Sequence, residues 1–212
     1  LSFFIYYNIN KICVIMFYWY YKGIILRTIN NNLDILAKMR DMKGTIKKFN
    51  IQSHRVNDKK GKVFALQILN QSQVLIQKLG LENCNFIENE NRYGIDLLAI
   101  NNNNEIIAAF EVEMRTNIWK GDTDFPFSEI KCLERKEYQW RKTEEFFQKI
   151  PSKYNYHKDI KTYYMQLNDI GNRSVIISGD EILKNKLVPW KTNVTNEYAR
   201  AVPLERCIKV RI

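Results

Sequence analysis

The chain has 212 residues and is 45% hydrophobic and 26% charged, an ordinary composition for a soluble globular domain with one full hydrophobic core. Its net charge of +10 and pI of about 9.4 favour an anionic partner, nucleic acid first and a membrane surface second. With only two histidines, His54 and His157, it lacks the spacings of a histidine-metal nuclease site, a Ser-His-Asp triad or an H-E-x-x-H zinc site. No glycine-rich phosphate-binding motif is present, so no nucleotide cofactor is expected. If the protein is an enzyme, we expect carboxylates to be its catalytic groups.

Residues 1–45 form a hydrophobic N-terminal extension, and we expect one domain over residues 46–212. The strongly apolar part of the extension, residues 12–21, is half of the roughly twenty residues that a membrane-spanning helix needs, so a membrane partner is not expected. It also lacks the basic leader and small-residue cleavage site of a signal peptide. Three interpretations stay open: upstream sequence captured with the gene, with the start at Met39 or Met42, a peripheral hydrophobic element, or a poor membrane anchor.

The four cysteines are widely separated, and none belongs to a C-x-x-C pair: Cys13, Cys84, Cys132 and Cys207. This spacing argues against a zinc module and against a disulfide framework. We therefore expect an intracellular protein in a reducing compartment.

Hydrophobic periodicity predicts an amphipathic helix over residues 58–81, with Gly80 near its end. Short apolar runs then predict strands, and a second helical segment begins near Lys136 after a short strand from Ser128. The remaining expected elements are two strands, a short helix and a last strand. By residue number, the expected strands are 85–88, 93–100, 105–114, 160–168, 173–179 and 206–212, and the short helix is 180–185. This order predicts an α/β fold with a central mixed sheet flanked by helices.

Four asparagines at 101–104 predict a tight turn, because Asn tolerates positive φ and bonds its own backbone. If the flanking strands form a hairpin across this turn, Asp96 lies opposite Ala109. Side chains alternate between the two faces of a strand, so Glu111 and Glu113 share the face of Asp96. The apolar residues between and beside the two glutamates point to the other face, into the core.

Three clustered carboxylates repel one another unless something neutralises them. A divalent cation does so most simply, since Mg²⁺ takes oxygen ligands and often binds one or two carboxylates plus a substrate phosphate. The alternative is a solvated sheet face on which the acids are paired with Lys and Arg.

The stretch "GIDLLAI…AAFEVEMR" resembles the core of the PD-(D/E)XK nucleases, the restriction-endonuclease-like superfamily, over roughly residues 60–180. After a leading helix, those proteins place an Asp on one strand and an (Asp/Glu)-x-Lys on the next. Asp96 matches the Asp, Glu111 the first acidic position and Glu113 the Lys position, while Ile95 stands where the motif has Pro. Some restriction enzymes of this superfamily carry Glu at the third position.

The resemblance implies metal-assisted hydrolysis of phosphodiester bonds. Asp96 and Glu111, with the Val112 carbonyl, would hold Mg²⁺, for which Mn²⁺ can substitute. Glu113 would position or deprotonate the attacking water or help to hold a second metal. A basic group from elsewhere would then replace the motif lysine, and Lys120 and Arg115 are near in sequence.

A basic segment with interspersed aromatics, residues 130–142, follows the acids and suits contacts with phosphates and unpaired bases. The predicted nucleic-acid-binding residues are Lys120, Lys131, Arg135, Lys136 and Arg141. The alternative is an amphipathic helix that packs its aromatic residues, Trp140, Phe146 and Phe147, inward.

Together these features predict a Mg²⁺-dependent endodeoxyribonuclease whose substrate is double-stranded DNA, and a homodimer would allow both strands to be cut. Two alternatives stay open. One is an inactive relative that only binds nucleic acid, and the other is a membrane-associated structural protein.

Overall fold

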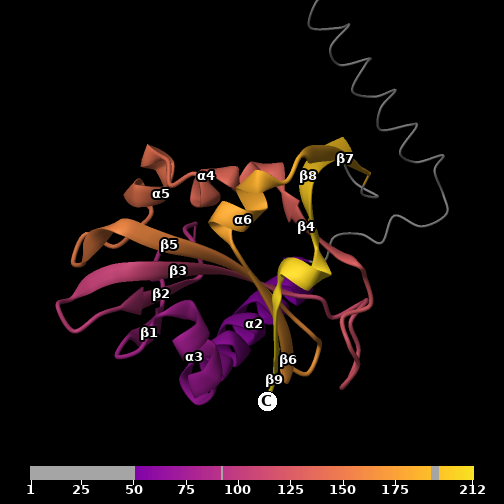
Figure 1. The fold of residues 1–212 in the computed structure, drawn as a ribbon, viewed down its shortest axis with the longest axis horizontal. Helices are drawn as coiled ribbons and strands as arrows, with labels where there is room; N and C mark the ends of the chain where they lie inside the picture. The colour runs from indigo at the N-terminus through magenta and orange to yellow at the C-terminus, as the bar shows by residue number, and fades with distance from the viewer. Residues whose placement is uncertain (1–50, 92, 192–195) are drawn as a thin grey trace, which may run out of the picture. The chain divides into compact units, whose positions relative to one another are not determined.

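The structure, a computed structural model, describes residues 51–91, 93–191 and 196–212, so the N-terminal extension at 1–45 lies outside the described residues (Figure 1). Helices α2, α3, α4, α5 and α6 span Ile51–Gln71, Gln73–Leu79, Glu137–Trp140, Glu144–Gln148 and Gly179–Lys184. Strands β1 to β9 span Asn85–Glu88, Leu97–Ile100, Glu105–Met114, Glu129–Leu133, Asn155–Leu167, Arg173–Ser178, Leu187–Lys191, Asn196–Pro203 and Ile208–Arg211. The short 3₁₀ helices η1 and η2 span Glu134–Lys136 and Leu204–Arg206. Among these described elements, no helix is long and apolar enough to cross a bilayer.

The expected α/β class, with a central mixed sheet flanked by helices, is confirmed. Six strands form a sheet in the order β1-β2-β3-β5-β6-β9, in which β3 and β5 are parallel and the other neighbours antiparallel. Helix α2 lies against one face of this sheet, and α4, α5 and α6 lie on the opposite side (Figure 1). A second, antiparallel sheet has the order β4-β8-β7. Strands β7 and β8 were not predicted, because Pro189 interrupts one run and charged residues divide the other.

The leading helix was predicted as one element and is two, α2 and α3. Ser72 caps the start of α3, where its hydroxyl accepts the Leu75 N–H at 3.4 Å, and Gly80 ends α3 with φ of 65°. Ser72 and Gly80 are residue types that favour these positions because one supplies a side-chain acceptor and the other adopts a left-handed backbone without strain.

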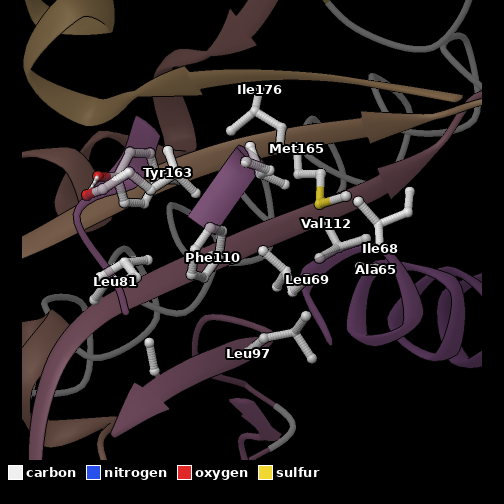
Figure 2. Close-up of a cluster of buried hydrophobic side chains, with 14 of the residues drawn as sticks. Ala65, Ile68, Leu69, Leu81, Leu97, Phe110, Val112, Tyr163, Met165 and Ile176 are labelled. Carbon is white, nitrogen blue, oxygen red and sulfur yellow. Dashed lines mark hydrogen bonds between the residues drawn. The ribbon is translucent and has the colours of Figure 1, made fainter. Parts of the chain in front are cut away.

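The main core lies between α2 and the sheet. Ile68 and Leu69 of α2 pack with Phe110 and Val112 of β3 and Met165 of β5 (Figure 2). The same strands also bury apolar side chains on their other face, so the sheet is covered on both sides.

Two of the aromatic residues that follow β4 are buried: Trp140 and Phe146 are each 1% exposed. For these two rings the inward-packing alternative is confirmed, and they are not available for stacking on bases.

The β2–β3 hairpin forms across the predicted asparagine turn. The Asn101 side-chain oxygen accepts the backbone N–H groups of Asn103 at 2.9 Å and Glu105 at 3.0 Å, and Asn104 has φ of 62°. The predicted register is wrong, because Leu98, not Asp96, pairs with Ala109. An irregularity between residues 99 and 100 contributes to the difference. The shift at this position is two residues, and a shift of two keeps the side chains of β2 and β3 on their predicted faces. Asp96 itself precedes β2 and does not share the face of Glu111, because it lies at the edge of β3 and contacts Lys62 of α2.

Candidate functional site

The site lies where β3 runs on past the start of β2. Strand β2 begins at Leu97, opposite Phe110, so the last residues of β3 pair with β5 on one side only. Asp96 stands at this open edge, where its Oδ2 accepts the Val112 N–H at 2.8 Å. The N–H and C=O groups of one strand residue point to the same side, so the Val112 carbonyl also faces the edge that Asp96 occupies.

A tight turn before β2 holds Asp96 in this position. The Asn89 side chain is buried and donates to the carbonyls of Ile95 at 2.9 Å and Lys149 at 3.2 Å, and the Asn89 N–H donates to the Asp96 carbonyl at 2.9 Å. Gly94 is required in this turn, because a Cβ there would lie 2.6 Å from Asn89 Nδ2.

Glu111 is buried in the middle of β3 on the face opposite α2. Its Oε1 forms an ion pair with Lys136, which comes from η1, and its Oε2 accepts from Gln139 Nε2 of α4 at 2.8 Å. Burial alone lowers the pKa of Lys136, but the charges of Glu111 and Glu113 outweigh it and raise that pKa above its ordinary value.

Glu113 lies two residues further along the same face and has partners of its own. Its Oε2 accepts from the hydroxyl of Tyr164 on β5, and its Oε1 lies 3.1 Å from Arg115 Nη1. Gln166 Nε2 in turn donates to the Tyr164 hydroxyl at 2.9 Å. Burial, and then the charge of Glu113, raises the pKa of Tyr164 well above its usual range, so the phenol stays protonated and acts as a donor.

Lys62 of α2 is the cationic partner of Asp96, with 3.3 Å between Nζ and Oδ1. The same ammonium lies 3.3 Å from Glu88 and 3.5 Å from Asp58, so three carboxylates surround it. Burial lowers the pKa of Lys62, but Asp96 and Asp58 raise it further than burial lowers it. Sequence reasoning missed Lys62, although its helical spacing from Ala65 places it on the buried face of α2.

Each of the three predicted acids therefore receives one cationic and one neutral donor. The pairs are Lys62 with the Val112 N–H on Asp96, Lys136 with Gln139 on Glu111, and Arg115 with Tyr164 on Glu113. The alternative of acids paired with Lys and Arg thus describes their contacts correctly, but the acids are not spread over a solvated face.

The favourable contacts of Asp96 do not fully offset the cost of ionising it in this position. Burial first, and then the negative charge of Glu111, raises the pKa of Asp96 to about 7, and the Val112 N–H and Lys62 only partly oppose this. Glu111 is the second cause of the raised pKa of Asp96, after burial. A carboxyl pKa displaced this far is more common at functional sites than in structural ion pairs.

Buried polar atoms without a hydrogen-bond partner also gather here. Of the five such side-chain atoms in the described part of the chain, four lie beside the acids or on α4: Arg115 Nε, Gln139 Oε1, Trp140 Nε1 and Gln166 Oε1. Unpaired buried groups are costly, and four of the five lie in this one region.

The donor set fits a Mg²⁺ ion with few protein ligands. In the described residues, no three His, Cys, Asp or Glu side chains converge as a metal-binding group. Asp96 and Glu111, with the Val112 carbonyl, would supply two carboxylates and one neutral oxygen, and Mg²⁺ commonly takes one or two carboxylates while water and substrate phosphate complete its shell.

The five predicted nucleic-acid-binding residues fall into two groups. Lys136 contacts an acid of the site. The other four form pairs elsewhere: Lys120 with Asp169, Lys131 with Glu129, Arg135 with Glu197 and Arg141 with Glu137. Lys120, Arg135 and Arg141 are more than half exposed, and such pairs contribute little to stability, so these three side chains can exchange their partners for phosphates. Lys131 is only 17% exposed.

No protein-family model, no curated protein and no solved structure matches this chain. Its function is therefore inferred from the geometry of the site.

Proposed function

We propose that this protein is a Mg²⁺-dependent endonuclease that hydrolyses phosphodiester bonds in DNA, a variant of the PD-(D/E)XK nucleases. Three features support the restriction-endonuclease-like interpretation. A leading helix packs on the sheet, an Asp stands at the start of β2, and a Glu lies in the middle of β3. Asp96 lies at the open edge of β3, where it accepts the Val112 N–H.

One observation carries the proposal: Asp96 binds the Val112 N–H across the open edge of β3, within electrostatic reach of the buried Glu111. This arrangement holds the Asp96 carboxylate against the backbone of Val112, the residue that follows Glu111 on β3. The ion pair between Lys62 and Asp96 does not need a second carboxylate close to it. Glu111 raises the pKa of Asp96, and this repulsion between two carboxylates lowers the stability of the folded chain.

The reaction class follows from these groups. Asp96 and Glu111, with the Val112 carbonyl, would hold Mg²⁺, which when bound would acidify a water molecule and offset charge on the phosphoryl oxygens. The water oxygen would attack phosphorus while one P–O ester bond breaks, and the leaving oxygen would take up a proton. Lys136 is the basic group that the motif lacks at Glu113, because its ammonium lies beside Glu111 and can stabilise charge on a phosphate oxygen.

Glu113 has a supporting role in this proposal. Its two oxygens contact Tyr164 and Arg115, and in this proposal Glu113 holds these two side chains beside the reacting groups. Arg115 is 24% exposed, so the exposed part of its guanidinium group can reach a phosphate while Glu113 fixes one end of it.

Cleavage of supercoiled plasmid and duplex oligonucleotides by the full chain, with Mg²⁺ or Mn²⁺, tests the proposal. Wild type is compared with Asp96→Ala and Glu111→Gln, and with Asp159→Ala as a matched control on an exposed part of β5. We expect metal-dependent cutting by wild type and the control and its loss in both site variants. Cutting that persists in both site variants would refute the assignment of the site.

A binding-only relative is the second candidate, and the one-to-one pairing of acids and cations is the observation that favours it. DNA binding without cleavage by a folded wild-type protein, in either metal and on every substrate, would decide for it.

A further inference from the structure

Lys136 occupies the place on Glu111 that the proposed function assigns to a metal ion. Its ammonium forms an ion pair with one oxygen of Glu111, and the charges of Glu113 and Asp96 also act on it. A divalent cation bound to Asp96 and Glu111 would meet this ammonium at close range. Two cations cannot share one carboxylate oxygen without strong repulsion, so binding of the metal and the Lys136 contact compete.

The three cations of the site differ in how easily they can leave. Lys62 is 8% exposed and lies among three carboxylates, so it keeps two of them if it loses Asp96. Arg115 contacts Glu113, which is outside the proposed metal ligands. Lys136 is 23% exposed and contacts one carboxylate, through a flexible four-carbon stem that starts from the short helix η1.

We propose that Lys136 is the internal counter-ion of Glu111, that it gives up this carboxylate when Mg²⁺ binds, and that the freed ammonium group then contacts the substrate phosphate. This inference rests on the proposed function, because it requires a metal at Asp96 and Glu111. It assigns Lys136 two successive partners, a carboxylate before the metal binds and a phosphate afterwards. The exchange keeps a cation on Glu111 throughout.

Binding of Mn²⁺ alone to the full chain, followed by calorimetry and by the paramagnetic signal of free Mn²⁺, tests the exchange without relying on cleavage. Lys136→Met removes the competing charge and keeps the length of the side chain. We expect it to bind Mn²⁺ about tenfold more tightly than wild type, a gain of about 1.4 kcal/mol. Cleavage at saturating metal should nevertheless fall by about 10² to 10³, the cost of removing one charge-stabilising donor. Lys158→Met, on the exposed start of β5, is the control and should bind Mn²⁺ as wild type does.

A second measurement on wild type does not depend on whether the variant folds. Reductive methylation followed by mass spectrometry should label Lys136 slowly without Mn²⁺ and faster with it, whereas labelling of Lys158 should not change. Equal protection of Lys136 with and without Mn²⁺ would overturn the inference, and so would a Lys136→Met protein that binds Mn²⁺ no more tightly than wild type. If wild type and variant both fail to bind Mn²⁺, the proposed function and the inference fall together.

Discussion

Replacing Asp96 by Asn should stabilise the domain at alkaline pH, although Asp96 makes two favourable contacts. The pKa of Asp96 lies near 7 instead of near 3.8, because the carboxylate is buried close to Glu111. A carboxyl group with a higher pKa in the folded than in the unfolded chain binds its proton more tightly when folded. Its contribution to stability is therefore fully present below about pH 4 and is lost as the pH rises through about 7.

The magnitude follows from the two pKa values. Each factor of ten in acid dissociation is about 1.4 kcal/mol, so the full effect of ionising Asp96 is about 4 kcal/mol. At pH 5 less than half of this has been lost, and at pH 8 nearly all of it has. Asn has no charge at either pH and can still accept the Val112 N–H. The stability of Asp96→Asn relative to wild type should therefore grow by roughly 2–3 kcal/mol between pH 5 and pH 8.

Urea denaturation followed by tryptophan fluorescence, at pH 5, 6, 7 and 8, measures this difference. The matched control is Asp159→Asn, an exposed carboxylate on β5. If the difference between Asp96→Asn and wild type is the same at all four values of pH, then burial and Glu111 do not act on Asp96 as argued. The electrostatic case for the site would then be refuted.

Three further changes test other parts of the argument. Gly94→Ala should destabilise the domain by about 1–3 kcal/mol, because the new Cβ would lie 2.6 Å from Asn89 Nδ2; an unchanged melting temperature would contradict this. Glu113→Gln should cost about 1–2 kcal/mol in chemical denaturation through its weakened bond with Tyr164 and should leave Mn²⁺ binding intact. Loss of Mn²⁺ binding in that variant would make Glu113 a metal ligand. Arg141→Ala should lower the slope of log affinity for duplex DNA against log salt by about 1, measured by fluorescence anisotropy in Ca²⁺, and an unchanged slope would exclude a phosphate contact.

The β2–β3 hairpin could be predicted because its signals are local. The asparagines at 101–104 specify the turn, and the two-residue period of the strands fixes which side chains share a face. The side chains of β2 and β3 thus keep their predicted faces despite an error of two residues in the register. A local irregularity of the ladder leaves no mark in the sequence pattern, so the register itself could not be predicted.

The partners of the acids could not be predicted, because they come from distant elements. Lys62 lies on α2, Lys136 on η1 and Tyr164 on β5, and only the packing of these elements brings them to β3. Lys136 was expected to contact nucleic acid, but the same sequence signal, a basic segment, also includes Lys131 and Arg135, which contact none of the three acids. A lysine that pairs with a buried carboxylate looks no different in the sequence from one that pairs with solvent.

The open edge of β3 has a consequence for association between chains. An unpaired strand edge offers N–H and C=O groups to which a strand of another molecule can add, and proteins often block such edges with charged side chains. The Asp96 carboxylate lies in line with the sheet and already holds the Val112 N–H, so an incoming strand would have to displace it and bury its charge. Asp96 therefore also blocks the addition of another strand to this edge of the sheet. A variant that replaces Asp96 with an apolar side chain would expose the edge, and copies of the chain could aggregate there.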